Sequence, residues 1–383
     1  MGGATNAGTP PMSEPAGFTS RLFVTGSLAF VLIGVLGAAY GVSLPAFGRA
    51  FGLQPGAAGL ILTTHALGGV LAVLAMTAGV RGLSAPVSMG LMAAGAALMA
   101  AGLSWPATLA GSLIAGSGFG LIATHVNRSF LNGFGPRGPG MVGLVNAISG
   151  IGLIAAPLVF VWVGGNPLVL FAAIALFALA LLALLPRGDG DPAPRGLPNL
   201  RQARMGILLL NLVSTGLEAA LAGLGVTTMI ALGWAESDAA RLASGFFAAF
   251  LLTRLALYWL TRIIPPGLLF LISVIGTALT AGIAALGWPA LGFVLSGATV
   301  GLAFPSFYVW GARVLGPDPR MAAAMLLSGL AGGAVGPLAF GALLAVVGLQ
   351  HLFVAVAGLA ALLAVAIALT LAPARAAALR EGR

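Results

Sequence analysis

The chain has 383 residues, of which 60% are hydrophobic and 7% are charged, and its formal net charge is +9. Soluble globular domains carry about 25% charged residues, so this composition excludes that class and indicates an integral membrane protein. The chain has no cysteine, which excludes disulfides, thiol catalysis and thiolate metal sites.

Twelve long apolar stretches follow one another along the chain. A bilayer core of about 30 Å requires about 20 apolar residues in a helix, whereas membrane-spanning strands need only about 9–11 residues. The length of the stretches therefore predicts an all-α integral membrane protein with twelve transmembrane helices. The expected segments are residues 22–46, 57–80, 86–103, 107–132, 139–163, 167–185, 205–232, 240–262, 266–286, 288–311, 321–347 and 350–372.

The arginines predict the orientation of these helices. All seventeen basic residues are Arg, and fourteen lie in or next to the two tails and the even-numbered gaps. Arg49 and Arg241 lie in the opposite gaps, and Arg254 lies inside a segment. Positive residues are retained on the cytoplasmic side, so both termini are expected to be cytoplasmic. Dispersed arginines of this kind meet anionic lipid headgroups and do not predict nucleic-acid binding.

Polar intervals divide the chain into domains. Residues 1–20 are rich in Gly, Pro, Ser and Thr and are expected to be a disordered cytoplasmic tail without the apolar core of a signal peptide. The longest polar interval, 186–204, is expected to be a cytoplasmic linker. It separates an amino-terminal six-helix bundle, 21–185, from a carboxyl-terminal bundle, 205–372. Residues 373–383 form a second cytoplasmic tail.

Four residues of the first six segments are candidates for the site: Tyr40, His65, Asn127 and Asn146. Asn127 and Asn146 carry amides that offer donors and acceptors together, which suits a hydroxyl-rich solute; the alternative is an Asn–Asn bridge between neighbouring helices. His65 is either a structural donor or part of a proton relay. Tyr40, with Phe304 of the tenth segment, suits stacking on the apolar face of a sugar ring.

Glu218 is the one acidic residue that falls within a segment, close to its middle. An intramembrane acid is a functional-site hypothesis by default. Asn211, Thr215 and Glu218 follow helical spacing and predict one polar stripe on the seventh segment. Burial favours a neutral carboxyl, so Glu218 is suited to load and release a proton; the alternative is a purely structural contact with an Arg.

Arg254 is the second charge inside a segment, on the eighth. One interpretation is that it binds an anionic substrate or pairs with Glu218. The alternative is a gate element whose head reaches water. Pro157, Pro305 and Pro337 are expected to kink their helices and to serve in gating. No His, carboxylate or thiol cluster has metal spacing, so neither a metal nor another cofactor is predicted.

The two halves match internally. Gly135-Pro136 precedes Pro157 by about one helix, and Gly316-Pro317 precedes Pro337 at nearly the same spacing. The fourth and tenth segments both contain runs of small residues, which are Gly116-Ser117-Gly118-Phe119-Gly120 and Ser296-Gly297-Ala298-Thr299-Val300-Gly301. Parallel six-helix repeats with a site between them characterise one large class of transporters.

This layout resembles the major facilitator superfamily over the whole chain beyond residue 20. The fucose and glucose permease-like branch is similar in three places: Gly118-Phe119-Gly120 with Asn127, Asn146, Gly150-Ile151-Gly152 and Pro157; Gly216-Leu217-Glu218; and Phe304-Pro305-Ser306. The resemblance implies two bundles that work by alternating access, with helices one, four, seven and ten lining the site. It also implies a monomer.

Several motifs depart from that superfamily. The loop around Arg81 lacks the usual Asp of the cytoplasmic gate, so Arg81 is expected to serve in gating without that latch. The proton-linked Arg of drug exporters is replaced by Ser112, and the antiporter motif of helix five is half kept. Arg128, at the end of the fourth segment, is expected to be a snorkelling anchor and gate element.

The sequence therefore predicts a transporter of the bacterial inner membrane and not an enzyme. We expect proton-coupled symport of a small polar solute such as a monosaccharide, with Glu218 as the coupling group. An exporter of drugs or amphiphiles, an organic-anion transporter using Arg254, and a non-transporting receptor on the same fold are the alternatives.

Overall fold

A computed structural model describes residues 16–53, 57–185, 202–316, 318 and 320–381. These residues form α-helices joined by short connections and three 3₁₀ turns, and they contain no strand. The helices are α1 (Ala16–Ala50), α2 (Leu60–Thr77), α3 (Ala85–Ala100), α4 (Trp105–Gly133), α5 (Gly138–Trp162), α6 (Pro167–Leu184), α7 (Gln202–Ala231), α8 (Glu236–Ile263), α9 (Pro266–Ala285), α10 (Pro289–Leu315), α11 (Met321–Val347) and α12 (Leu352–Glu381).

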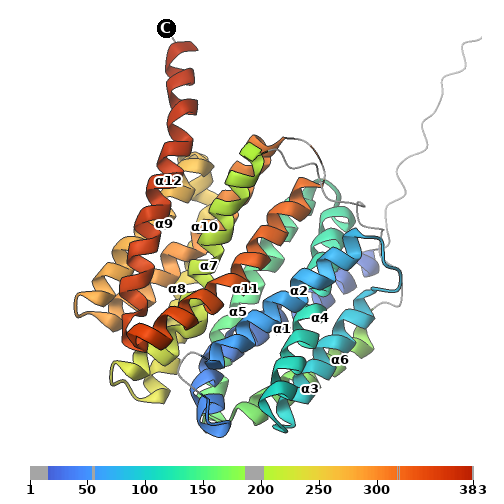
Figure 1. The fold of residues 1–383 in the computed structure, drawn as a ribbon. Helices are drawn as coiled ribbons and strands as arrows, with labels where there is room; N and C mark the ends of the chain where they lie inside the picture. The colour runs from blue at the N-terminus through green and yellow to red at the C-terminus, as the bar shows by residue number, and fades with distance from the viewer. Residues whose placement is uncertain (1–15, 54–56, 186–201, 317, 319, 382–383) are drawn as a thin grey trace, which may run out of the picture.

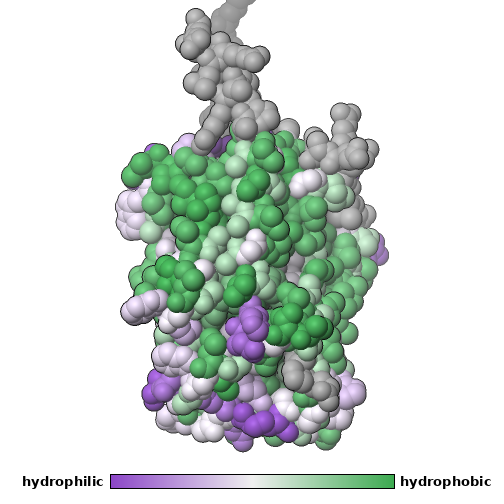
Figure 2. Space-filling view, turned by 60° about the vertical axis from the view of Figure 1, so that its left-hand side comes forward, coloured by the Kyte–Doolittle hydropathy of each residue, from purple (hydrophilic) through white to green (hydrophobic). Residues whose placement is uncertain are grey.

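Eleven of the helices in the described residues are long and apolar enough to cross a membrane. The exception is α3, whose 16 residues extend about 24 Å at 1.5 Å per residue, less than a bilayer core of about 30 Å. The all-helical class is confirmed, while twelve crossings and cytoplasmic termini remain predictions. Figure 2 shows that the visible flank is mostly apolar, as expected of a surface that faces lipid.

The helices at the two ends of the chain are longer than the predicted segments. α1 begins at Ala16, directly after Pro15, so residues 16–20 are helical and do not belong to the tail. α12 continues to Glu381, because the segment after Pro373 is rich in alanine, the strongest helix former. The rest of the amino-terminal tail and residues 186–201 of the predicted linker lie outside the described residues.

Helices α1–α6 form one half of the molecule and α7–α12 form the other (Figure 1). Successive helices run in opposite directions, so both halves begin and end at the same end of the bundle. We call the end that holds Ala16 and Glu381 the terminal end. The opposite end, which holds the α1–α2 and α7–α8 connections, is the distal end.

Glycines bring equivalent helices together in the two halves. A side-chain methyl at Gly116 of α4 would collide with the carbonyl of His65 in α2, and one at Gly297 of α10 would collide with the carbonyl of Phe246 in α8. The α2–α4 and α8–α10 contacts therefore depend on small residues in the same way, as is common between membrane helices. The repeat predicted from the small-residue runs is thus visible in the packing.

The two halves pack against each other through their distal portions. Thr63 of α2 donates a hydrogen bond to the Ala334 carbonyl of α11 at 3.0 Å, and Ser244 of α8 donates one to the Ile154 carbonyl of α5 at 3.1 Å. Gly41 of α1 lies directly against the backbone of α7. These contacts join the halves at a level between the bundle centre and the distal end.

Candidate functional site

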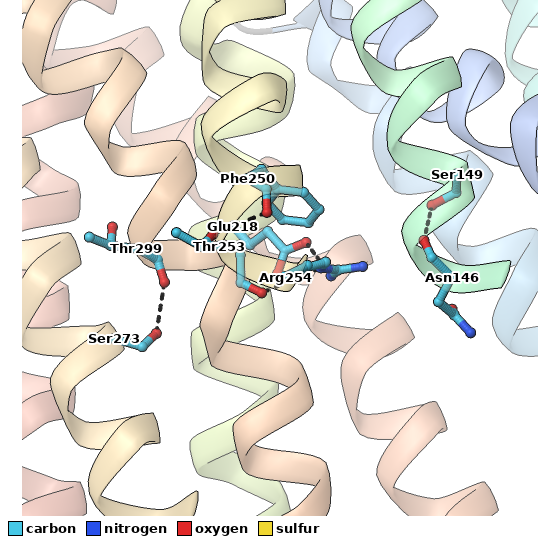
Figure 3. A network of polar contacts seen from close by, with 9 residues as sticks. Asn146, Ser149, Glu218, Phe250, Thr253, Arg254, Ser273 and Thr299 are labelled. Atoms are coloured by element: carbon cyan, nitrogen blue, oxygen red, sulfur yellow. Dashed lines mark hydrogen bonds and ion pairs between the residues drawn. The ribbon is translucent and has the colours of Figure 1, made fainter. Parts of the chain in front are cut away.

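The two charges predicted to lie inside the membrane face each other. Glu218, in the middle of α7, and Arg254, on α8, form an ion pair with 3.9 Å between Glu218 Oε1 and Arg254 Nη2 (Figure 3). Their side chains are 24% and 21% exposed, respectively. Because an unpaired charge in such surroundings is costly, the two groups stabilise each other's charged forms.

Two further contacts hold the Arg254 guanidinium. Its Cζ lies 4.1 Å from the ring centroid of Phe250, one helical turn earlier on α8, and its Nε donates a hydrogen bond to the Gly301 carbonyl of α10 at 3.3 Å. Gly301 permits this approach, since a side chain there would collide with the Phe250 carbonyl and the Thr253 hydroxyl. The cation is therefore fixed by an aromatic face, a carbonyl and a carboxylate.

The other half contributes a pair of amides. Asn146 of α5 donates through Nδ2 to Asn127 Oδ1 of α4 at 2.8 Å and to the Val142 carbonyl at 2.8 Å. The bridging interpretation of the two amides is thus observed. Ser149 lies on the same helix and donates to the Asn146 carbonyl (Figure 3).

A direct contact between the halves places the charged pair and the amide pair at a similar height in the bundle. The Leu251 side chain of α8 packs on Gly150 of α5. The two helices run in opposite directions, so Asn146 and Arg254 each lie about one turn from this contact, both towards the terminal end. Polar groups from both halves therefore lie just on the terminal side of the packed distal region.

Comparisons with known proteins concern the fold. No protein-family model and no curated protein matches the chain. Solved structures do match it. A mutant of the nucleoside transporter NupG matches at 18% identity and TM-score 0.71, with 90% of this chain and 98% of that chain covered. The fold is that of the major facilitator superfamily.

Two sugar transporters have the same major facilitator fold. A D-xylose-proton symporter matches at 13% identity and TM-score 0.75, covering 92% of this chain and 97% of its own. A mutant of the E. coli fucose:proton symporter FucP matches at 17% identity and TM-score 0.62, covering 91% and 98%. The predicted layout of a major facilitator protein is thereby confirmed at the level of fold.

The residues of the predicted polar stripe on α7 contact two different neighbouring helices. Asn211 is fully buried, and its Nδ2 donates to the Met325 carbonyl at 3.2 Å and to the Ser328 hydroxyl at 2.8 Å, both on α11. Thr215 bonds the carbonyl of Asn211 on its own helix. Asn211 therefore fastens α7 to α11, whereas Glu218 points to α8.

The two aromatic residues that were predicted to stack on a sugar ring lie in different surroundings. Tyr40 is fully buried, and its hydroxyl is 3.0 Å from His65 Nδ1, so these two residues of α1 and α2 pair with each other. Phe304 is half-buried on α10, 6.0 Å from Tyr308 between ring centroids and beside Gly329. Of the two aromatics, Phe304 is the one with exposed surface.

The predicted gating residues are spread over several helices and connections. Arg81 is exposed in the α2–α3 connection, and Arg128 follows Asn127 on α4 and is half-buried. Pro157, Pro305 and Pro337 lie inside α5, α10 and α11. Their role in gating stays a prediction. The described residues contain no group of His, Asp and Glu suited to a metal ion.

Three features of the site were not predicted from the sequence. Phe250 stands four residues before Arg254, a spacing that places them on one helix face and was available as a signal. No feature of the sequence predicted the role of the Gly301 carbonyl, because a residue pattern does not show which backbone acceptors a side chain will meet. The Gly150–Leu251 contact joins distant parts of the chain and required the three-dimensional arrangement.

Proposed function

We propose that this protein is a proton-coupled secondary transporter that moves a small polar, monosaccharide-like solute by alternating access. The observation that carries the proposal is that a charged pair of one half and a pair of amides of the other lie at one level of the bundle, beside the Gly150–Leu251 contact that joins the halves. A solute held there would contact both halves and would sense their relative movement. The major facilitator fold of a D-xylose-proton symporter and a fucose:proton symporter supports this class of solute.

The ion pair supplies a route for coupling. A proton taken up by Glu218 removes its negative charge and so releases Arg254 from that partner, while Phe250 and the Gly301 carbonyl still hold the guanidinium in place. Solute hydroxyls then meet the N–H groups of Arg254 without competition from a charged carboxylate. Solute and proton would thus favour the same state, which is the requirement for positive coupling between two ligands.

The orientation follows from the arginine pattern. The terminal end, which holds Ala16 and Glu381, faces the cytoplasm, and the distal end faces outward. We place the protein in the inner membrane of a bacterium as a monomer surrounded by lipid, with protons and a small solute as its ligands and with neither a cofactor nor enzymatic activity.

The test begins with a ligand screen on the detergent-purified protein. A ligand that binds only the folded state adds about 2.7 kcal/mol of stability at 100 times its dissociation constant, enough to shift the unfolding temperature. We expect sugars to stabilise the protein. Stabilisation by amphiphiles alone would favour an exporter and would contradict the proposal.

The second step measures proton flux in liposomes with a pH-sensitive dye. Adding the stabilising sugar to Glu218→Gln should produce solute exchange without proton movement, since the amide cannot carry a proton through the cycle. Asp238→Asn, which removes an exposed acid at the distal end, is the control and should leave the coupled flux intact. Unchanged proton flux in Glu218→Gln would exclude the coupling role.

Transport of an organic anion is a second candidate, and one observation favours it. At 3.9 Å the contact between Arg254 Nη2 and Glu218 Oε1 is longer than a hydrogen bond, so the guanidinium has donors left for another carboxylate. In the same screen, stabilisation by organic acids that disappears in Arg254→Gln would support this candidate over the sugar.

A further inference from the structure

Apart from Arg254, two arginines lie outside the tails and even-numbered gaps where most arginines of this chain are found, and each forms an ion pair. Arg49 and Arg241 lie in gaps that otherwise lack arginine, at the distal end. Arg241 bonds Asp238, three residues earlier on α8, at 3.0 Å, so this pair is local. Arg49 instead bonds Glu236, 187 residues away in the other half of the molecule.

The Arg49 pair joins the ends of two helices. Nη2 of Arg49, in the last turn of α1, lies 2.8 Å from Glu236 Oε2 and 3.2 Å from Oε1, in the first turn of α8. A carboxylate is favoured at the amino terminus of a helix, so the position of Glu236 in the first turn of α8 suits its negative charge. A local helical contact accounts for Arg241, but Arg49 has no such partner on its own helix.

Beneath this pair lies the packing that closes the distal end. Gly41 lies against the backbone at Ala222, the Leu62 side chain lies against Gly223, and Ala66 faces Gly333. Each contact joins α1 or α2 with α7 or α11, so each must separate before a solute can enter from the distal end. The ion pair spans the same boundary at its outer edge.

We propose that the Arg49–Glu236 pair is a latch that holds the distal end closed and must break for that end to open. The side chains are 63% and 31% exposed, so water and salt reach them, and such pairs are individually weak. A weak ion pair suits a transporter, because it favours the closed state of the distal end and still allows that end to open. The latch concerns the movement required by the proposed function, but its test needs neither solute nor proton.

The experiment uses the absence of cysteine. Ala222→Cys places one thiol in the closed distal packing, and a membrane-impermeant maleimide added to intact cells and to inside-out vesicles reports which side reaches it and how fast. We expect Arg49→Gln and Glu236→Gln each to raise the labelling rate from the distal side by about twofold to fivefold, equivalent to about 0.4–1 kcal/mol. Leu62→Cys serves as a second reporter of the same packing.

Matched controls separate a latch from a general effect of charge. Arg241→Gln and Asp238→Asn remove the neighbouring pair, which lies within one half, and should leave the labelling rate unchanged. High salt should raise the rate in the parent and not in Arg49→Gln, because the parent alone has a pair to screen. The exchange Arg49→Glu with Glu236→Arg should bring the rate back towards the parent value.

Equal labelling rates in the parent and in both latch variants, at both reporters, would overturn the proposal. So would an equal rise in the Arg241 and Asp238 controls. A failed solute screen would leave these labelling results untouched, so the latch and the proposed function fail separately.

Discussion

At the scale of single residues, the site depends on the shape of the Arg254 guanidinium as well as on its charge. The Cζ of the planar group lies over the Phe250 ring, its Nε donates to the Gly301 carbonyl, and its Nη2 reaches Glu218. A lysine ammonium is a compact point charge and cannot make all three contacts. Charge alone therefore does not explain the choice of arginine at this position.

Arg254→Lys should accordingly reduce transport although the positive charge remains. Losing the aromatic contact costs about 0.5–2 kcal/mol, so we expect kcat/KM for the solute to fall by about tenfold. Flux into liposomes, measured over a range of solute concentrations, checks this, with Arg241→Lys at the exposed distal pair as control. Equal kcat/KM in Arg254→Lys and the parent would mean that only the charge matters.

The sequence predicted the participants of this site better than their contacts. Glu218 and Arg254 stand out because charge is rare in the apolar segments, which made both of them candidate site residues. Asn127 and Asn146 were named together as amides, and the bridge between them was one of the two interpretations. Burial of Tyr40 and the use of the Gly301 carbonyl depend on how helices pack, and hydropathy carries no information about that.

At the scale of helices, glycine sets how closely neighbours approach. A methyl at Gly116 would meet the carbonyl of His65, and one at Gly297 would meet that of Phe246. The close packing of α4 on α2 and of α10 on α8 therefore requires glycine at these two positions. Overfilling a packed contact costs about 1–3 kcal/mol. We expect Gly116→Ala and Gly297→Ala to lower the unfolding temperature of the detergent-purified protein by similar amounts, since they occupy equivalent places in the repeat.

The neighbouring helices of the same repeat provide controls. Gly90 of α3 and Gly282 of α9 have open space where a methyl would lie. Gly90→Ala and Gly282→Ala should therefore be neutral or slightly stabilising, because alanine is the better helix former. If all four substitutions had the same effect, helix propensity and not packing would explain the glycines.

Hydropathy predicted where helices occur but not how far each one extends. The third segment was expected at 86–103, whereas α3 ends at Ala100 and is shorter than a bilayer core. Trp105 opens α4 after Ser104, whose side-chain oxygen accepts from the Ala107 N–H and caps the helix. Capping therefore set the start of α4, in a stretch where the apolar composition alone left the boundary open.

At the scale of the whole molecule, the two halves meet in the distal portion through contacts that a transport cycle must break. A methyl at Gly333 of α11 would lie 3.7 Å from the Ala66 Cβ of α2, within the 3.5–4.5 Å typical of disulfide-linked residues. Cysteines at these two positions would join the halves covalently. The parent chain contributes no cysteine of its own, so only this pair can form.

Ala66→Cys with Gly333→Cys should therefore form a disulfide on mild oxidation and lock the distal end closed. We expect solute flux in liposomes to stop after oxidation and to return after reduction, because alternating access requires the distal contacts to separate. Each single cysteine variant, oxidised in the same way, should keep its flux. Full flux in a quantitatively cross-linked double variant would show that the halves do not separate at this contact, and the alternating movement would have to be sought elsewhere in the bundle.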